Sequence, residues 1–586
     1  MRRTKIVCTL GPATMSVDML KKLIANGMDV ARINFSHGTY ASHKQTIELL
    51  KEAREAMNAP IPLMLDTKGP EIRIKNFSTE SVILENGKPF TLTTEEVEGD
   101  ETKVSITYAE LPKDVTKGTT ILIDDGLIEL EVTGTTEKEI FCKIVNGGVV
   151  SANKGVNVPG VYINLPSLTE KDVADLKFGV ENGFDLVAAS FIRSAADVAK
   201  LRHVLEEFGG EKMLIISKIE NREGVNNIDE ILEVSDGIMV ARGDLGVEIP
   251  PEEVPLVQKT LIRKANALNK HVITATQMLE SMISNPRPTR AEANDVANAI
   301  FDGTDCVMLS GETAKGDYPA EAVATMARIA EKTESSIDYT EMLTKTFSKV
   351  KTSITNALSY AACTAAAELG TTCICTVTRS GFTARMVAKH RPICPIVAGT
   401  GDEQVWRQLN LLWNCKPVLY QKETPTSEMF HAAVEVAKQS GLVREGDTIV
   451  TVVGMPAGTS GATNTMRVDI VGNILCKGIG IGHKRISGKS CIIRTRKDLE
   501  TKFRKGDILV TTATDNDYMP YIQKASALIV GPVGNGDTCH AEIAARALNL
   551  PVILCNTKVV DFLPDRTLLT LDPQSGSVFR GIPENE

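Results

Sequence analysis

A short apolar run that ends in charge constrains this chain more than any other feature of its sequence. Residues 214–216 are apolar and lead through Ser217 into Lys218 and Glu220, and residues 237–241 lead in the same way towards Asp244. Because Lys218 and Glu220 are two positions apart, a β-strand places their side chains on one face. We expect buried parallel strands that open onto a functional site at their charged ends. The alternative is a structural ion pair that caps a core strand.

The same pattern recurs eight times, and segments with helical apolar spacing separate most of the copies. The predicted strands are residues 5–10, 30–35, 62–66, 186–191, 214–218, 237–241, 272–276 and 306–310. The predicted helices include residues 17–26, 43–57, 198–208, 227–234 and 254–268. An open doubly wound sheet could use these elements, but eight copies with polar ends favour a closed (β/α)8 barrel. Such barrels carry their chemistry at the carboxyl ends of the strands, where this chain has Arg32, Asn34, Asp66, Lys218, Glu220, Asp244 and Thr276.

Seven segments carry a resemblance to a known family. They are residues 9–13 (Thr-Leu-Gly-Pro-Ala), 31–38 (Ala-Arg-Ile-Asn-Phe-Ser-His-Gly), 65–73 (Leu-Asp-Thr-Lys-Gly-Pro-Glu-Ile-Arg), 217–221 (Ser-Lys-Ile-Glu-Asn), 241–246 (Ala-Arg-Gly-Asp-Leu-Gly), 275–279 (Ala-Thr-Gln-Met-Leu) and 309–314 (Leu-Ser-Gly-Glu-Thr-Ala). In order and spacing they resemble the pyruvate kinases. The resemblance covers about residues 1–475, and the remainder resembles an extension found in some bacterial members.

Four domains are expected. Roughly 100 residues separate the third and fourth predicted strands, far more than the ~2 to 6 of an ordinary βα loop. The domains are a catalytic (β/α)8 TIM barrel at 1–70 and 166–345, a β-rich (β-barrel) lid at 71–165, an α/β effector-binding domain at 346–475, and a C-terminal phosphohistidine-like domain at 476–586. Within the lid, an Asp-Asp-Gly turn at 124–126 predicts a hairpin. The glycine-rich residues 478–482 are predicted to be a link, and residues 487–490 a surface loop.

The resemblance implies transfer of a phosphoryl group from phosphoenolpyruvate to ADP, which gives pyruvate and ATP in glycolysis. Such a phosphotransferase works by positioned cations rather than by covalent chemistry. The resemblance also implies a cytoplasmic homotetramer. The implied catalytic residues are Lys218, Arg32 and Thr276. The implied contacts to phosphoenolpyruvate are Arg32, Arg73 and Lys218 on the phosphoryl group, and Gly243, Asp244 and Thr276 on the carboxylate.

Two cations follow from the same resemblance. Glu220 and Asp244 are the expected ligands of Mg2+, an ion that takes one or two protein carboxylates. The expected K+ ligands are Asn34, Ser36, Asp66 and Thr67, and a strand-end hydrogen-bond pair is the alternative for Asn34 and Ser36. Family members with glutamate at the position of Glu71 require K+, so the resemblance implies this dependence here. The expected nucleotide contacts are Asn34, His37, Arg73 and Lys154, with Asn157 nearby in the lid.

Residues 378–383 follow a predicted strand and open a helix-like run. Backbone N–H groups and hydroxyls can bind a phosphate in such a place. In the family this loop binds a phosphorylated allosteric effector, which implies contacts from Thr378, Arg379, Ser380, Gly381 and Thr383. The alternative is an ordinary turn with Ser380 as the helix N-cap.

The extension contains a segment, residues 538–546, that resembles the Thr-Ser-His-Ala-Ala motif of phosphohistidine domains. Cys539 and Glu542 depart from that motif, and Asn535 replaces a usual glycine before it. We therefore expect His540 to be a vestigial structural residue rather than a phosphate carrier.

Composition excludes several other classes. The net charge of −9, without a basic block, argues against nucleic-acid binding, and no stretch approaches the ~20 apolar residues of a membrane helix. The twelve cysteines lie scattered in apolar runs and are expected to be reduced. A phosphoenolpyruvate-dependent lyase, aldolase or carboxylase on a similar barrel is an alternative, and so is an idle scaffold protein. The lid argues against the first, and the intact set of charged strand ends argues against the second.

Overall fold

The computed structural model describes residues 1–163, 165–347, 353–422, 426–455, 463–472, 474–534 and 539–582. The chain forms two compact units. The first comprises Met1–Thr364, Thr376–Thr426 and Val453–Thr465, and the second comprises Ala365–Cys375, Ser427–Val452 and Met466–Glu586. Among the described residues, no helix is both long and apolar enough to cross a membrane.

A closed barrel of parallel strands forms the centre of the first unit and confirms the predicted fold class. Its strands are buried throughout or nearly so, which explains why they are apolar on both faces. Around the barrel they follow the order β1, β17, β16, β15, β14, β13, β3, β2. Their bounds are β1 Lys5–Thr9, β2 Val30–Asn34, β3 Leu63–Asp66, β13 Leu186–Ala189, β14 Leu214–Ile219, β15 Gly237–Ala241, β16 His271–Ala275 and β17 Cys306–Leu309.

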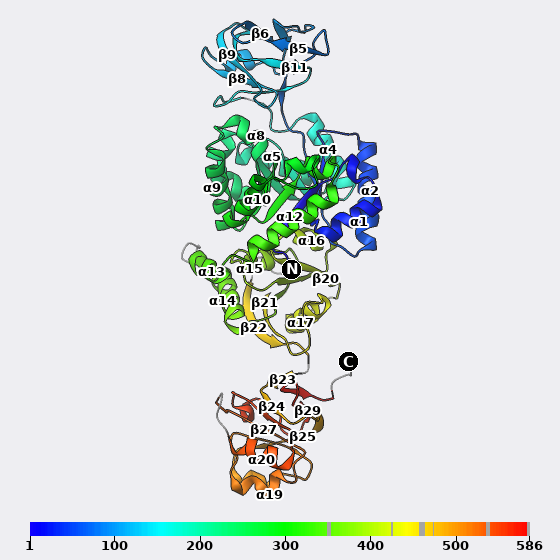
Figure 1. The fold of residues 1–586 in the computed structure, drawn as a ribbon, viewed down its shortest axis with the longest axis vertical. Helices are drawn as coiled ribbons and strands as arrows, with labels where there is room; N and C mark the ends of the chain where they lie inside the picture. The colour runs from blue at the N-terminus through cyan, green and yellow to red at the C-terminus, as the bar shows by residue number, and fades with distance from the viewer. Residues whose placement is uncertain are drawn as a thin grey trace. The chain divides into compact units, whose positions relative to one another are not determined.

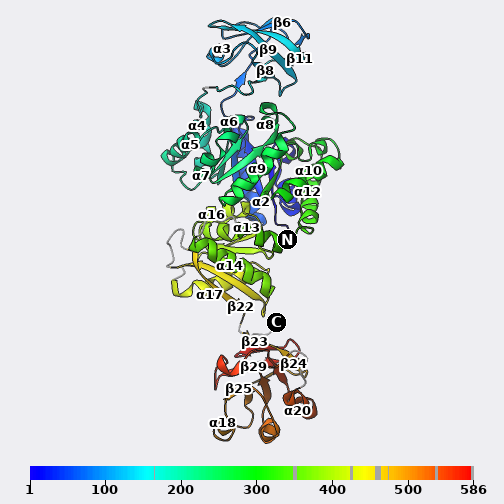
Figure 2. The same ribbon diagram turned by 90° about the vertical axis from the view of Figure 1, so that its left-hand side faces the viewer.

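Helices surround these strands, as Figure 1 and the turned view in Figure 2 show. Helices α2 and α5 each begin three residues before the apolar spacing predicts. Thr39 and Ser194 cap them with side-chain acceptors, so each helix begins at its cap, one turn before its periodic apolar residues. The helices are α1 Val17–Asn26, α2 Tyr40–Ala56, α4 Glu170–Glu181, α5 Ala195–Glu207, α6 Arg222–Asn226, α7 Ile228–Val234, α8 Arg242–Glu248, α9 Val254–Ala267, α10 Arg290–Asp302, α11 Gly311–Ala314 and α12 Pro319–Glu334.

The long insert between β3 and β13 is rich in β-structure. A seven-stranded sheet has the order β4, β12, β8, β9, β10, β6, β7, and β11 pairs with β5. Asp124 and Asp125 both have positive φ, so the predicted Asp-Asp-Gly turn joins β8 to β9. The elements are β4 Ile72–Arg73, β5 Ser81–Leu84, β6 Pro89–Thr93, β7 Lys103–Ser105, α3 Leu111–Asp114, β8 Thr120–Ile123, β9 Ile128–Thr135, β10 Glu139–Asn146, β11 Gly148–Ser151 and β12 Gly155–Asn157.

An α/β region follows the barrel. Its five-stranded sheet has the order β20, β19, β18, β21, β22, with parallel pairing of β19 to β20 and of β18 to β21. The elements are α13 Tyr339–Phe347, α14 Ile354–Leu369, β18 Cys373–Val377, α15 Phe382–Ala388, β19 Ile396–Thr400, α16 Glu403–Gln408, β20 Cys415–Leu419, α17 Met429–Gln439, β21 Thr448–Gly454 and β22 Thr463–Ile470.

The C-terminal part of the second unit is built on an eight-stranded sheet of order β23, β30, β29, β25, β26, β27, β28, β24. Two sequence interpretations are wrong here. The glycine-rich residues 478–482 contain strand β24, and residues 487–490 lie inside strand β25. The elements are β23 Ile474–Lys477, β24 Ile479–Ile481, β25 Ile486–Ile493, α18 Arg496–Thr501, β26 Ile508–Thr511, α19 Met519–Ile522, β27 Ala527–Val530, α20 His540–Leu548, β28 Val552–Leu554, β29 Leu568–Asp572 and β30 Ser577–Arg580. All twelve cysteines are described, and all are free thiols.

A buried ion pair at the amino-terminal end of the barrel strands joins Asp185 to Arg407 of α16. Arg407 donates from Nε to both carboxylate oxygens at 3.0 and 3.1 Å, and Leu63 N donates to Asp185 at 3.0 Å. Asp185 is fully buried, and burial raises its pKa although Arg407 opposes the rise. The ionised form of Asp185 therefore depends on the positive charge of Arg407.

We predict that Arg407→Met destabilises the local structure by about 3–5 kcal/mol, because it leaves a buried carboxylate without its cation. Hydrogen exchange of the amides in β3 and β13 measures the loss. Lys212→Met is the matched control, since Lys212 pairs with Asp402 while its own side chain is 65% exposed, and it should cost at most about 1 kcal/mol. Equal effects of the two variants would contradict the account.

Candidate active site

Four charged side chains meet at the carboxyl ends of β2, β3 and β14. Arg32 donates from Nε to Asp66 Oδ2 at 2.6 Å. The Lys218 ammonium lies 3.1 Å from Asp66 Oδ1 and 2.8 Å from Glu220 Oε1. None of the four residues is more than 8% exposed. The structure thus brings together residues that the sequence placed on separate strand ends.

Mutual pairing keeps Asp66 and Lys218 charged. Burial alone would raise the pKa of Asp66, but Arg32 and Lys218 hold it below its usual value. Burial alone would lower the pKa of Lys218, but the carboxylates of Asp66 and Glu220 raise it instead. The result is a set of fixed charges that need no solvent rearrangement to act on a ligand.

Two neighbours of the cluster escaped the sequence analysis. Ser190 accepts a hydrogen bond from Lys218 Nζ at 2.7 Å and donates to the carbonyl of Thr67 at 2.6 Å. The backbone N–H of Phe191 donates to Glu220 Oε2 at 2.6 Å, and Phe191 has a φ of 55°. Positive φ is strained for an aromatic residue and is characteristic of functional sites. The sequence does contain a signal for Ser190, because this polar residue ends an apolar run in the same way as Asp66.

Gly243 and Asp244 lie in the first turn of α8, immediately after β15, and Thr276 follows β16. The N–H of Gly243 donates to Thr276 Oγ1 at 2.8 Å. Thr276 has a φ of 66°, and Arg242 donates from Nη2 to its carbonyl at 2.6 Å. Arg242 is itself paired with Asp295 at 2.6 Å. This chain of contacts holds the hydroxyl of Thr276 beside Gly243.

The ends of β2 and β3 carry the residues that the sequence predicts as ligands of a monovalent cation. Asn34 lies opposite Asp66 in the strand register, and Asn34 Oδ1 accepts the N–H of Ser36 at 3.0 Å. The carbonyl of Thr67 follows directly. The donors Asn34, Ser36, Asp66 and Thr67 offer only oxygen, which hard cations prefer. The Asp66 carboxylate is shared with Arg32 and Lys218.

Glu220 and Asp244 are the carboxylates available for a divalent cation. Asp244 is close enough to contribute to the rise in the pKa of Glu220. Among the described residues, no group of three or more His, Cys, Asp or Glu side chains could hold a metal ion. Two carboxylates fit Mg2+, which completes its coordination with substrate oxygens and water.

Arg73 and Lys154 are not part of the charged cluster. Arg73 pairs with Glu71 at 2.6 Å and donates to the carbonyl of Asn153 at 2.6 Å. Lys154 pairs with Asp124 at 2.8 Å. Both residues therefore make these contacts inside the insert. His37 lies on the exposed loop after β2, and its N–H donates to the carbonyl of Asn34 at 3.4 Å.

A cleft of about 470 Å³ lies beside Asp244 and is lined by the insert and the barrel. Glu71 and Asn157 line it from the insert, and Phe191, Asp244 and Glu248 line it from the barrel. Asn157 donates to Glu248 Oε1 at 2.9 Å across it. Its size suits a small ligand.

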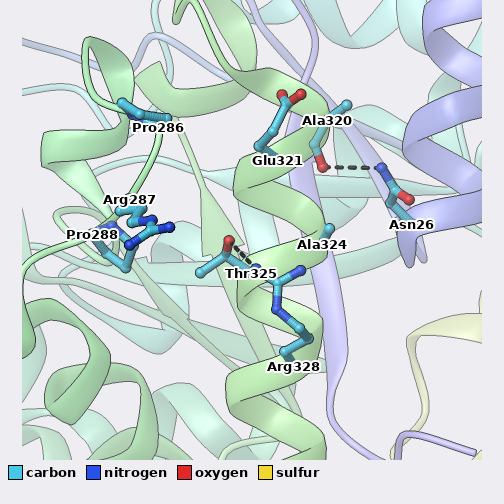
Figure 3. A pocket seen from close by; sticks show the side chains of 9 residues that line it. All are labelled: Asn26, Pro286, Arg287, Pro288, Ala320, Glu321, Ala324, Thr325 and Arg328. Carbon is cyan, nitrogen blue, oxygen red and sulfur yellow. Dashed lines mark hydrogen bonds between the residues drawn. The ribbon is translucent and has the colours of Figure 1, made fainter.

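A second hollow of similar volume lies elsewhere on the barrel, and none of the predicted site residues lines it. Figure 3 shows two of its lining residues, Arg287 on the loop before α10 and Arg328 on α12. Arg328 donates to Thr325 Oγ1 at 2.8 Å, and Asn26 of α1 donates to the carbonyl of Ala320 at 3.0 Å. The charged cluster therefore remains the candidate site.

The predicted effector loop lies between β18 and α15. Gly381, with a φ of 76°, is the N-cap of α15, and no side chain caps the helix. The alternative in which Ser380 is the N-cap is therefore wrong. Thr378 N donates to the carbonyl of Gly399 at 2.8 Å, and the hydroxyls of Thr383 and Thr463 are 3.0 Å apart.

His540 begins α20 in the second unit. Its Nδ1 lies 3.0 Å from Thr514 Oγ1, and its Nε2 lies 3.3 Å from Asn516 Oδ1. Asn535 and Thr538, which bear on the resemblance of this segment, lie outside the described residues.

Comparisons with known proteins agree across the chain. Residues 1–323 match the barrel domain of pyruvate kinase, residues 356–469 its alpha/beta domain, and residues 503–576 the mobile domain of PEP-utilising enzymes. The chain is 49% identical to a pyruvate kinase of Geobacillus stearothermophilus, 48% identical to one of Bacillus licheniformis, and 46% identical to one of Sporosarcina psychrophila. Each alignment covers 99% of both chains.

Burial raises the pKa of Glu220 to about 7, although Lys218 opposes the rise. Below that pH a proton occupies the carboxylate and competes with a divalent cation. We predict that Mg2+ binds the free protein about tenfold more tightly at pH 8 than at pH 6. Isothermal titration calorimetry across this pH range measures the Mg2+ affinity. Glu220→Gln should weaken Mg2+ binding and flatten the pH dependence of the affinity. A flat profile for the wild-type protein would contradict the prediction.

Proposed function

The chain belongs to the pyruvate kinase family, and we propose that it transfers the phosphoryl group of phosphoenolpyruvate to ADP, giving pyruvate and ATP. The observation that carries this proposal is the buried cluster of Arg32, Asp66, Lys218 and Glu220 at the mouth of the barrel. We place the reaction in glycolysis, in the cytoplasm, and in a homotetramer. The full-length relatives support the reaction.

Fixed charge is what phosphoryl transfer requires of a protein. Arg32 is oriented by Asp66 and by Thr9, whose Oγ1 accepts from its Nη1 at 2.8 Å, so its guanidinium can hold the phosphoryl group. Lys218 is fixed by two carboxylates and Ser190. As the phosphorus–oxygen bond to the enol breaks, the oxygen gains negative charge, and the Lys218 ammonium stabilises it.

Glu220 and Asp244 would hold Mg2+, while Asn34, Ser36, Asp66 and Thr67 would hold K+. When bound, these ions supply the positive charge that offsets the anionic substrates. The chain's own part is to present oxygen ligands from adjacent strand ends.

Gly243, Asp244 and Thr276 would contact the substrate carboxylate. The N–H of Gly243 already donates to Thr276 Oγ1, so the substrate would replace that acceptor and leave the hydroxyl of Thr276 to turn towards it. Asn34 and His37 would contact ADP from the barrel. Arg73 and Lys154 would reach it by exchanging Glu71 and Asp124 for phosphate oxygens as the lid closes.

We also propose that the loop of Thr378, Arg379, Ser380, Gly381 and Thr383 binds a phosphorylated allosteric effector. The support is that glycine, rather than a side chain, caps α15, which leaves the backbone N–H groups open to a phosphate. His540 keeps a structural role, because both ring nitrogens already have neighbours in Thr514 and Asn516.

Lys218→Met tests where the chemistry takes place. Turnover should fall about a thousandfold, the loss expected for one preorganised electrostatic contact, while apparent affinity for phosphoenolpyruvate changes little. A coupled assay of pyruvate formation measures both quantities. Lys212→Met, which removes an exposed barrel lysine, should keep full turnover. Retention of more than a tenth of wild-type turnover by Lys218→Met would exclude this role.

Glu71→Lys tests the need for K+. Glu71 lies beside Arg73 and leaves the site one positive charge short, so wild-type activity should depend on added K+. The variant should show higher K+-free activity and a weaker response to K+ in tetramethylammonium buffer. Glu71→Gln, which removes the negative charge without adding a positive one, is the control. Its K+-free activity and its response to K+ should both change less than those of Glu71→Lys. Full wild-type activity without K+ would remove the ion from the mechanism.

A further inference from the structure

The first turns of α4 carry two carboxylates, Asp172 and Asp175, that are both fully buried. Burying a carboxylate costs free energy unless partners compensate it. The capping box of α4 uses only part of Asp172 and none of Asp175. The remaining contacts of both residues lead to the two loops that we propose as the K+ site.

Asp172 holds the loop after β3. Its Oδ2 accepts from the N–H and hydroxyl of Thr169, at 2.9 and 2.7 Å, and its Oδ1 accepts the N–H of Gly69 at 3.0 Å. Gly69 has a φ of 71°, and a Cβ there would lie 2.8 Å from Phe191. Glycine is thus required where this loop turns back from Thr67 towards the insert.

Asp175 holds the loop after β2 through its neighbour Lys171. Its Oδ2 accepts from Lys171 Nζ at 2.6 Å, and the same ammonium donates to the carbonyl of Phe35 at 2.9 Å. Its Oδ1 accepts from the hydroxyl of Tyr40 at 2.7 Å. The ring of Tyr40 stacks on Phe178 of α4 with centroids 4.7 Å apart. Phe35 stands between Asn34 and Ser36, so these contacts fix the loop that carries both.

The two loops diverge at the end of the strand pair. The register between β2 and β3 ends where Asn34 faces Asp66, and one further backbone hydrogen bond, from the N–H of Phe35 to the carbonyl of Asp66 at 2.9 Å, joins the two chains beyond it. Lys171 and Asp172 are consecutive residues of one helix. Through these two residues α4 joins the carbonyl of Phe35 to the N–H of Gly69, and so adds a constraint on the separation of the two loops.

We propose that Lys171, Asp172 and Asp175 are positioning residues for the monovalent cation, because they hold the two loops at the separation that the ion requires. This inference rests on the proposed K+ site. The three residues touch neither the ion nor the substrates. Their loss should weaken K+ binding more than it lowers turnover at saturating K+.

Lys171→Met tests the inference in the full-length protein. The K+ concentration for half-maximal activity should rise about five- to tenfold, the ratio that loss of one hydrogen bond produces. Turnover should largely recover at saturating K+. A second readout needs no catalysis: without substrates, K+ in place of tetramethylammonium should raise the melting temperature of the wild-type protein, and the variant should need five- to tenfold more K+ for the same rise.

Lys177→Met is the matched control. Lys177 lies on the same helix and forms an exposed pair with Glu181 at 4.0 Å, so its loss should leave both K+ curves unchanged. Tyr40→Phe removes only the hydroxyl bonded to Asp175 and should shift both curves in the same direction as Lys171→Met. If Lys171→Met does not fold, Tyr40→Phe alone tests the inference.

Unchanged K+ curves in Lys171→Met or Tyr40→Phe, beside a wild-type protein that responds to K+, would overturn the positioning role. A wild-type protein indifferent to K+ in both readouts would overturn the proposed K+ site and this inference with it.

Discussion

The rest of the site depends on the two ion pairs that the Asp66 carboxylate forms with Arg32 and Lys218. Asp66 lies 1% exposed at the end of a barrel strand, accepts from Arg32 on one oxygen, and faces Lys218 with the other. Two cations that would repel each other are held close together because this carboxylate lies between them and pairs with both. Closure of the barrel makes that possible, since it brings β2, β3 and β14 around one mouth. The charges that act on an anionic substrate are therefore a consequence of the fold.

The same carboxylate links the two proposed cation sites. Asp66 belongs to the oxygen set proposed for the monovalent ion, while its partner Lys218 also pairs with Glu220, which we propose as a ligand of the divalent ion. A change at either site would alter the charge that Lys218 experiences. Ser190 reinforces the link, because it accepts from Lys218 and donates to the carbonyl of Thr67. The proposed role of α4 extends this network from the electrostatics of the site to its geometry.

Much of this could be predicted from sequence, for identifiable reasons. Buried parallel strands are apolar on both faces, so strands such as β15 were placed to the residue and their charged ends pointed to the site. Contacts made by backbone or by pairing inside the insert leave no such pattern. The N–H of Phe191 on Glu220 and the pairing of Arg73 with Glu71 were therefore missed. In the C-terminal sheet, Gly480 pairs with Ile553 of β28, and glycine is required in this strand because the carbonyl of Pro573 leaves no room for a Cβ.

Phosphorus-31 NMR of the wild-type protein with phosphoenolpyruvate, Mg2+ and K+ tests the central claim most directly. With ADP present, the signal of phosphoenolpyruvate should disappear as the γ-phosphate of ATP grows in equal amount, and pyruvate should accumulate in the same proportion. Without ADP, the phosphoenolpyruvate signal should persist. Pyruvate formation without ADP, or release of inorganic phosphate in place of ATP, would contradict direct phosphoryl transfer at the barrel mouth.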